Sequence, residues 1–465
     1  MEISSDELDK ELIEDLKEEN PDKLSKLVEE GSGKDLKFLL KNMGRLPDEF
    51  DGEPFIKLLD SEEEDLRYHA VKNVGRLKDD KYLGEMKERF EKEDSTEVRS
   101  EIISTIGRMR SEKAKPFLVD LLEHKNPEIV LQAVRALYAF KKEPEIREKL
   151  ESMINHENEV VRKVIRKDFF PDDESIERHT EYPEFMENKM VQSDVRKVLD
   201  DVPDNSIHLT FTSPPYYNAR DYSIYKSYEE YLDFLEEVFE EVHRVTKKGR
   251  YMIVNTSPVL MPRVGRNYSS NRYPIPFDLH ERLTDNGWEF IDEIIWLKPE
   301  ASAVHRNAGF VQHRKPLAYK PNARTEYLMV YRKDTTKLLD WNINQYSDQD
   351  IEESKVEGEY ESSNVWEIAP SNDKEHSAVF PEELCEKVIK FYSMKNDLVF
   401  DPFAGTGTLG KSALKNSRKF FMTEIEEDYI QRAKEKLNPA PLDSGSQPNF
   451  QNLEEFKTDA KANQE

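Results

Sequence analysis

Cysteine is nearly absent from this chain of 465 residues, and long apolar runs are absent altogether. The single cysteine, Cys385, excludes an internal disulfide and any cysteine-rich zinc site, and its place on an apolar helical stripe favours a core position. No run of about 18 apolar residues occurs, so no transmembrane helix is expected. The acidic residues 1–6 lack the apolar segment of a signal peptide. We therefore predict a cytoplasmic protein with no membrane partner.

Positive charge is the second shortage. The chain has 69 lysines and arginines against 96 aspartates and glutamates, a net charge of −27. This balance opposes a polyanionic partner unless basic residues are concentrated locally. It also suits a salt-rich cytoplasm, a hypothesis that activity measured against KCl concentration would test. Hydrophobic residues still form 37% of the chain, which is enough for folded cores, and the length favours about two to four domains.

A repeat occupies the first third of the chain. Met43–Leu46 (MGRL) recurs as Val74–Leu77 (VGRL) and as Ile106–Met109 (IGRM), at spacings of 31 and 32 residues. Polar turns alternate with helical apolar stripes at this period, which indicates an α-solenoid with two helices per unit. The pattern resembles HEAT repeats over about residues 31–170. Such a solenoid docks a partner protein or DNA, or it is a rigid spacer or packing platform.

Strands alternate with helices from Met190 onward, after a polar linker near residue 175. The apolar run 207–211 is typical of a buried strand in a parallel sheet, and the runs 290–296 and 326–331 could pair as an antiparallel edge. The predicted domains are an acidic helical repeat domain at 1–175, an α/β domain at 176–440 and a disordered tail at 441–465.

The stretch Thr212–Tyr217 (TSPPYY) follows the predicted strand at 207–211 directly. Its two prolines end the strand and fix a rigid turn at the carboxyl end, where open α/β sheets bind ligands. The Ser213 hydroxyl and the Pro214 carbonyl can accept both protons of an exocyclic amine. Tyr216 can stack on a planar base, which is worth about 1–3 kcal/mol. Taken alone, the stretch is equally typical of a stiff turn or a polyproline ligand.

A glycine-rich turn, Asp401–Thr408 (DPFAGTGT), stands between a predicted strand and a helix. Its glycines let the backbone approach a ligand closely, and the helix N-terminus faces that ligand. Glu424 ends the next strand about 20 residues further on, at the position from which an acid grips ribose hydroxyls. A solvated acid at a strand end is the alternative for Glu424.

Basic residues are concentrated in two loop stretches despite the overall acidity. Residues 298–333 hold eight bases against two acids, and residues 257–277 hold three arginines and no acid. Such side chains neutralise phosphates and read base edges, so the stretches predict DNA binding, with ordinary solvated loops as the alternative. The candidates are Arg263, Arg266, Arg272, Lys298, Arg306, Arg314, Lys315, Lys320 and Arg324.

Together, residues 188–438 resemble the β-group, or permuted, DNA amino-methyltransferases that use S-adenosylmethionine. Asp401–Gly407 resembles their cofactor-binding motif I and Thr212–Tyr216 their catalytic motif IV, in the chain order of the permuted group. The resemblance implies an α/β fold, a permuted Rossmann-like methyltransferase with a mostly parallel seven-stranded sheet, here preceded by the all-α HEAT-like solenoid. It also implies double-stranded DNA as the substrate and a target-recognition insertion at about 298–360.

The roles of the site residues are implied by the same resemblance. Asp194 meets the cofactor adenine and Glu424 its ribose, and no metal is required. One departure is 376–381 (HSAVFP), where the family usually has His-Pro-Thr-Gln-Lys-Pro. The implied catalytic residues are Ser213, Pro214, Pro215 and Tyr216, and the implied cofactor-binding residues are Asp194, Asp401, Phe403, Gly405, Thr406, Gly407, Thr408 and Glu424.

The serine in Ser-Pro-Pro-Tyr is more typical of enzymes that methylate the N4 amine of cytosine. The resemblance therefore implies site-specific transfer to a flipped-out cytosine, with or without an accompanying restriction endonuclease. Three alternatives stay open. They are adenine N6 as the acceptor, methylation of RNA or of a protein amide, and a non-catalytic scaffold whose repeats bind a partner.

Overall fold

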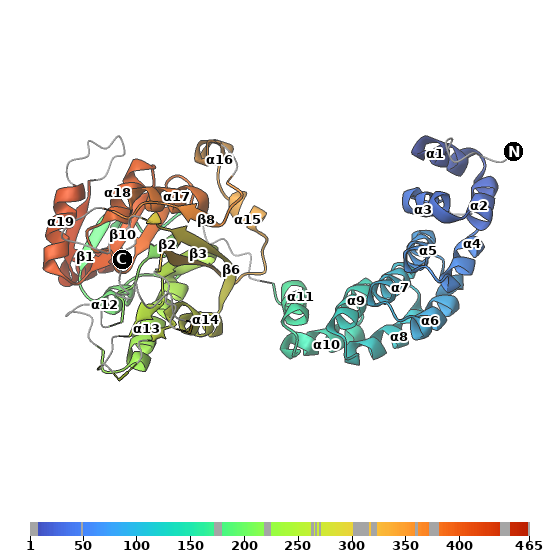
Figure 1. The fold of residues 1–465 in the computed structure, drawn as a ribbon, viewed down its shortest axis with the longest axis horizontal. Helices are drawn as coiled ribbons and strands as arrows, with labels where there is room; N and C mark the ends of the chain where they lie inside the picture. Colours follow the sequence, from blue (N-terminus) through green and yellow to red (C-terminus); the bar gives the residue numbers. More distant parts are fainter. Residues whose placement is uncertain are drawn as a thin grey trace. The chain divides into compact units, whose positions relative to one another are not determined.

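The computed structural model describes residues 8–47, 50–171, 179–217, 225–261, 265, 267–268, 271–300, 316–317, 323–358, 361–371, 381–437 and 447–463. Contacts divide the chain into two compact units, Met1–Pro171 and Asp172–Glu465. Figure 1 shows the first unit as a stack of helices and the second as a sheet with helices packed on it. Among the described residues, no helix is both long enough and apolar enough to cross a membrane.

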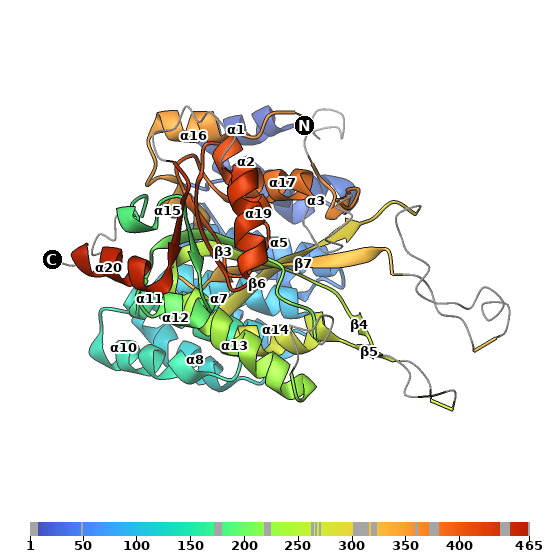
Figure 2. The same cartoon turned by 90° about the vertical axis from the view of Figure 1, so that its left-hand side faces the viewer.

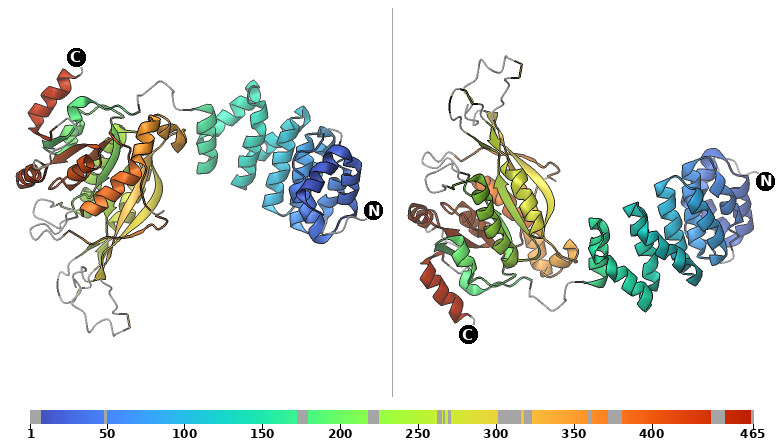
Figure 3. Two further views of the ribbon diagram at one scale, coloured as in Figure 1. Left: turned by 90° about the horizontal axis from the view of Figure 1, so that it is seen from above. Right: turned by 90° about the horizontal axis from the view of Figure 1, so that it is seen from below.

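Helices stack in chain order through the first unit (Figures 1 and 3). Each carries an apolar stripe that packs on its neighbours, and the stripes share one buried core. The stack begins before residue 31, because Ile13 and Leu24 belong to the same core. The helices are α1 (Lys10–Glu19), α2 (Pro21–Glu30), α3 (Gly33–Asn42), α4 (Glu53–Lys57), α5 (Glu64–Leu77), α6 (Leu83–Lys92), α7 (Thr96–Met109), α8 (Lys115–Asp120), α9 (Pro127–Leu137), α10 (Pro144–Glu151) and α11 (Glu159–Phe169).

The repeated glycines explain how neighbouring repeats approach one another. A Cβ atom at Gly75 on α5 would lie 2.6 Å from Thr105 Oγ1 on α7. A Cβ atom at Gly107 on α7 would lie 2.7 Å from the Cβ of Ala136 on α9. Any side chain at these positions would push the helices apart, so the spacing of the sequence repeat reflects close helix packing.

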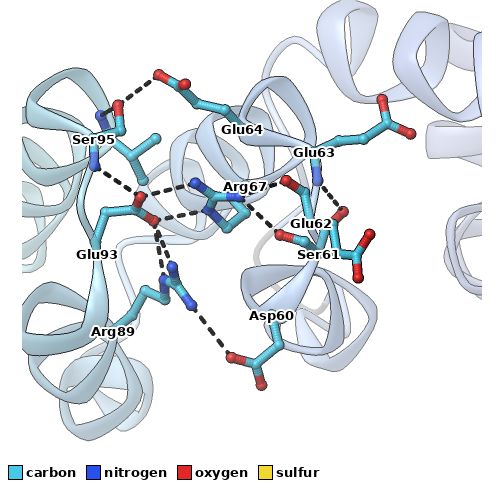
Figure 4. Close-up of polar contacts among 10 residues, drawn as sticks. Asp60, Ser61, Glu62, Glu63, Glu64, Arg67, Arg89, Glu93 and Ser95 are labelled. Carbon is cyan, nitrogen blue, oxygen red and sulfur yellow. Dashed lines mark hydrogen bonds and ion pairs between the residues drawn. The ribbon is translucent and has the colours of Figure 1, made fainter.

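Glu93 is a buried charge between two repeats, and Figure 4 shows it between two arginines. Its two carboxylate oxygens accept from Arg67 Nε and Nη2 at 2.8 and 2.9 Å, and Oε2 also accepts from Arg89 Nη2 at 2.7 Å. Burial alone would raise the pKa of Glu93. Hydrogen bonds from Arg67, the Ser95 backbone and Arg89 outweigh it and lower the pKa to about 2.

A nine-stranded sheet forms the second unit, in the order β11-β1-β10-β9-β2-β3-β7-β6-β8. All neighbouring pairs are parallel except those of β7, which is antiparallel to both β3 and β6. The predicted antiparallel pairing of 290–296 with 326–331 is therefore confirmed. The strands are β1 (Lys189–Gln192), β2 (Ile207–Thr212), β3 (Thr246–Thr256), β6 (Trp288–Leu297), β7 (Thr325–Lys333), β8 (Val365–Glu367), β9 (Leu398–Asp401), β10 (Lys419–Glu424) and β11 (Asn449–Asn452).

Helices cover both faces of this sheet (Figures 1 and 2). Successive residues of the central strand β9 point to opposite faces, so Phe400 belongs to one buried cluster and Val399 to the other. The first cluster is completed by α12 (Val195–Leu199), α13 (Tyr228–Val245), α14 (Ile275–Asp285) and α20 (Leu453–Ala462), and the second by α17 (Glu382–Tyr392), α18 (Thr408–Lys415) and α19 (Glu427–Leu437).

Two predictions about this unit need correction. The predicted seven strands are nine, because β8 and β11 extend the sheet at its two edges. The tail predicted as disordered contains β11 and α20, which are held because β11 pairs with β1 and Phe456 is fully buried. The Phe456 ring stacks on Phe421, with 5.5 Å between ring centroids.

The target-recognition insertion at about 298–360 stays a prediction, and its range includes a strand of the core sheet. This strand is β7, which is paired on both sides. Residues 301–315, 318–322 and 359–360 lie outside the described residues. The part of the predicted insertion after β7 carries two short helices, α15 (Leu339–Ile343) and α16 (Asp348–Ser354).

Candidate active site

The candidate site is built on one edge of the sheet, where the carboxyl ends of neighbouring parallel strands meet. β1, β10, β9, β2 and β3 run in the same direction, so their carboxyl ends lie side by side. β7 runs the opposite way and brings its first residues, Thr325 and Glu326, to the same edge. Because β2 and β9 are neighbours, the motif after β2 lies beside the glycine-rich turn after β9.

The predicted catalytic residues follow β2 directly. Pro214 is buried, whereas Ser213, Pro215 and Tyr216 are partly exposed. The Tyr216 hydroxyl donates to Glu326 Oε2 at 3.2 Å. Burial and then the negative charge of Glu326 raise the pKa of Tyr216, so its hydroxyl stays protonated. The turn thus presents a serine hydroxyl and an aromatic ring at the ligand-binding edge.

A hydrogen bond joins the two motifs. Thr212, the last residue of β2, donates from Oγ1 to Asp401 Oδ1 at 2.6 Å. The same oxygen of Asp401 accepts from the backbone N–H of Phe403 at 3.0 Å, which shapes the turn after β9. Burial raises the pKa of Asp401 to about 7, although both hydrogen bonds act to lower it. Asp401 therefore holds the Ser-Pro-Pro-Tyr turn and the glycine-rich turn in register.

The raised pKa of Asp401 predicts that the stability of the folded protein depends on pH. The folded protein keeps its proton up to about pH 7, whereas the unfolded chain releases it near 3.8. The folded state binds more protons between these values, so raising the pH weakens it by up to about 1.4 kcal/mol per pH unit. We expect the free energy of unfolding of Asp401→Asn minus that of wild type to rise from pH 4 to 7 and then to level off. Denaturant unfolding at several pH values measures this, and parallel pH profiles would contradict it.

Gly405 and Glu424 form a cradle beside this turn. Gly405 has a φ of +51°, and apart from its chain neighbours no atom of the described residues lies within 4 Å of where its Cβ would be, so a ligand can approach the backbone there. Glu424 Oε2 accepts from the Gly405 N–H at 2.8 Å, and Oε1 accepts from the N–H groups of Ile425 and Glu426 at 2.8 and 2.9 Å. A carboxylate accepts about four hydrogen bonds, so one position stays available for a ligand hydroxyl.

Three other residues predicted to bind the cofactor have protein partners. Asp194 caps α12, accepting from the Arg196 N–H at 3.0 Å, and pairs with Arg196 Nη2 at 2.7 Å. Hydrogen bonding from Arg196 lowers the pKa of Asp194. Thr406 and Thr408 both accept through Oγ1 from Lys436 Nζ, at 2.6 and 3.0 Å. Their contacts with a cofactor stay predictions.

The remaining two cofactor candidates shape the turn. The Phe403 ring is partly buried, with its centroid 6.0 Å from that of Phe234. Gly407 has a φ of +75°, and a Cβ there would lie 3.3 Å from the Cβ of Ala433 on α19. Gly407 therefore lets α18 and α19 pack closely where the turn enters α18.

The predicted DNA-binding residues are described only in part. Arg272 is exposed on β5 (Arg272–Tyr273), which pairs with β4 (Val259–Leu260). Arg324 Nε donates to the carbonyl of Lys298 at 3.1 Å, and Lys298 pairs with Glu326. Lys298 is thus tied into the site. Arg263, Arg266, Arg306, Arg314, Lys315 and Lys320 lie outside the described residues, as does most of the departure at 376–381.

Asn255 and Glu326 also belong to the site, although they were not predicted from the sequence. Asn255 Nδ2 donates to Glu326 Oε2 at 2.8 Å and lies 3.4 Å from Ser213 Oγ. Both residues stand at strand ends, after 251–254 and at the start of 326–331. The antiparallel pairing brings both to the carboxyl edge of the parallel strands. In the part of the chain that the structure describes, no cluster of three or more His, Cys, Asp or Glu residues could hold a metal ion.

Comparison with known families decides what this site belongs to. The model of the DNA methylase family (N6_N4_Mtase) matches residues 207–435, which span both the Ser-Pro-Pro-Tyr turn and the glycine-rich turn. Through its α/β unit, the chain belongs to the N6/N4 DNA methylase family. The model of HEAT repeats matches residues 52–137 and 86–167. The predicted N4/N6 methyltransferase with a HEAT-like domain in front of it is confirmed.

Individual DNA methylases resemble the chain at moderate identity. The type II methyltransferase M.BglII of Bacillus subtilis is 26% identical over 298 residues, covering 61% of this chain and 79% of that protein. M.MwoI of Methanothermobacter wolfeii is 28% identical over 261 residues, covering 54% of this chain and 34% of that protein. The solved structure of a DNA modification methylase from Thermus thermophilus, TTHA0409, is 26% identical with a TM-score of 0.46, covering 57% and 99% of the two chains.

Proposed function

We propose that this DNA methylase transfers a methyl group from S-adenosylmethionine to the exocyclic N4 of a cytosine flipped out of double-stranded DNA at specific sites. The observation that carries the proposal is the Thr212–Asp401 hydrogen bond of 2.6 Å. It fixes the Ser-Pro-Pro-Tyr turn next to the Gly405 and Glu424 cradle, so an amine on one turn faces a cofactor on the other.

The residues of the cradle fit S-adenosylmethionine. When bound, this cofactor supplies an electrophilic methyl group on a sulfonium. The open space over Gly405 admits a ligand against the backbone, and the remaining acceptor position of Glu424 suits one ribose hydroxyl. Burial in this mostly enclosed site raises the pKa of Glu424, although the three backbone hydrogen bonds that it receives act to lower it.

The chain's own residues prepare the amine. Ser213 Oγ and the Pro214 carbonyl accept its two N–H groups, which draws the nitrogen out of conjugation with the ring and frees its lone pair. Tyr216 stacks on the base after it leaves the duplex, a step that costs a few kcal/mol. Positioning of this kind can supply about 7–11 kcal/mol of the barrier. One N–H proton passes from the methylated nitrogen to solvent water, so the product amine is neutral.

The serine supports cytosine as the acceptor, because Ser-Pro-Pro-Tyr is more typical of cytosine N4 enzymes than of adenine N6 enzymes. The partners are double-stranded DNA at the active site and, through the helical repeats, a partner protein such as a cognate restriction endonuclease. With genomic DNA as the substrate, the enzyme acts in the cytoplasm.

A transfer assay tests the proposal. Purified protein is incubated with methyl-labelled S-adenosylmethionine and with unmethylated DNA, RNA or protein, and the products are digested and separated by mass spectrometry. We expect label in DNA as N4-methylcytosine. Label as N6-methyladenine would contradict the choice of base, and label in RNA or protein alone would contradict DNA as the substrate. The pair Ser213→Ala with Tyr216→Ala should abolish the label, whereas a non-catalytic scaffold would transfer none in either form.

A further inference from the structure

Glu326 contacts Tyr216 of the Ser-Pro-Pro-Tyr turn directly and is linked to Ser213 through Asn255. Its Oε2 atom accepts from the Tyr216 hydroxyl at 3.2 Å and from Asn255 Nδ2 at 2.8 Å. Asn255 Nδ2 in turn lies 3.4 Å from Ser213 Oγ. One carboxylate oxygen therefore touches Tyr216 directly and reaches Ser213 through a single amide.

The other side of Glu326 is held by a cation. Lys298 Nζ pairs with Oε1, and Lys298 Nζ lies 4.6 Å from the ring centroid of Trp296. The Glu326 side chain is only 14% exposed, and Asn255 is 2% exposed. A mostly buried carboxylate held by three donors has little freedom to move. Its position is thus set by the ends of β3, β6 and β7.

We propose that Glu326 is a positioning residue for the amine that receives the methyl group. The inference rests on the proposed function and deepens it. Glu326 fixes the Tyr216 ring for stacking and, through Asn255, fixes the Ser213 hydroxyl that accepts an amine proton. Its negative charge also lies near a nitrogen that becomes positive as it gains the methyl group.

Only a side chain with two hydrogen-bond acceptor atoms, such as a carboxylate, satisfies all the donors around Glu326. Tyr216, Asn255 and Lys298 all donate towards Glu326. A glutamine at this position would turn its NH2 group towards at least one of these donors and so break one contact without removing volume. Glu326→Gln therefore tests the hydrogen bonding, and Glu326→Asp tests the reach of the carboxylate.

Lys298 gains a different role from the one that its sequence context suggests. A lysine on a DNA phosphate would change the salt dependence of DNA binding, lowering the slope by about one when removed. A lysine that holds Glu326 would change kcat and leave that slope as it is. We expect Lys298→Met to follow the second pattern.

The experiment is steady-state kinetics on DNA with wild type, Glu326→Gln, Glu326→Asp and the control Glu367→Gln. Glu367 is an exposed carboxylate on β8, opposite Leu297 at the same edge of the sheet. We expect Glu326→Gln to lower kcat by about 100-fold, as a small misplacement of reacting groups does. Glu326→Asp should recover part of this loss, Glu367→Gln should match wild type, and the KM for S-adenosylmethionine should stay within about twofold.

The outcomes separate this inference from the proposed function. If the wild type methylates DNA and Glu326→Gln has the same kcat, the positioning role alone is overturned. If Glu326→Gln loses cofactor binding, or the thermal unfolding transition of the α/β unit, together with kcat, the positioning role is also overturned in favour of a structural role. Wild type without transfer to DNA would overturn the proposed function and this inference with it. A fall in kcat with cofactor binding and unfolding unchanged supports it.

Discussion

Ser213→Ala is expected to lower kcat by about 10²–10³ while S-adenosylmethionine still binds. The serine hydroxyl lies on the turn after β2 and, in the proposed mechanism, accepts a hydrogen bond from one N–H of the target amine as that nitrogen becomes nucleophilic. This contact matters most in the transition state, so its loss appears in kcat. The cofactor cradle at Gly405 and Glu424 is built on the ends of other strands, β9 and β10, so cofactor affinity should stay within about twofold.

Ser227→Ala is the matched control for this variant. Ser227 caps α13, accepting from the Glu230 N–H at 3.1 Å, and its removal should cost about 1 kcal/mol of stability with kcat unchanged. Single-turnover rates and cofactor titrations on both variants distinguish chemistry from folding. Equal kcat values for Ser213→Ala and wild type would remove the serine from the mechanism.

Glu93→Gln should destabilise the helical repeat unit by about 3–5 kcal/mol. The carboxylate is fully buried and bridges Arg67 on α5 and Arg89 on α6 (Figure 4). An amide of the same size removes the charge that both guanidinium groups share, and Arg89 keeps only its ion pair with the exposed Asp60 at 3.4 Å. Because the pKa of Glu93 is lowered to about 2, its contribution is fully present above about pH 4.5 and is lost as the pH falls towards 2.

Glu91→Gln is the control, because Glu91 is exposed two residues away. Thermal unfolding followed by circular dichroism should show a lower midpoint for Glu93→Gln and an unchanged midpoint for Glu91→Gln. The difference between Glu93→Gln and wild type should also shrink at acid pH. A stability loss that is independent of pH would mean that packing of the side chain, rather than its charge, holds the two repeats together.

Features with a local cause could be predicted from the sequence. The recurring glycines marked the helical repeats because Gly75 and Gly107 stand where neighbouring helices touch. Each of the two site motifs combines a strand, a turn and special backbone residues within a short stretch, so their positions at the sheet edge were predicted correctly. The pairing of β6 with β7 was predicted from the apolar runs 290–296 and 326–331.

Features that depend on distant contacts were missed. Asn255 and Glu326 lie 71 residues apart, and nothing in either neighbourhood indicates that antiparallel β7 returns Glu326 to the catalytic edge. β11 is a polar strand whose sequence is typical of a disordered tail. It forms because the edge of β1 offers backbone partners and because Phe456 finds a place against Phe421.

Modification-sensitive sequencing of DNA shows directly which base the protein methylates. The protein is expressed in a host that lacks DNA methylation, beside the Ser213→Ala variant, and the host genome is read for modified bases. Wild type is expected to give N4-methylcytosine in one sequence context, and Ser213→Ala is expected to leave at most a small fraction of those sites modified. If the protein is folded at the salt concentration used and the genome still contains no modified base, this expectation is contradicted.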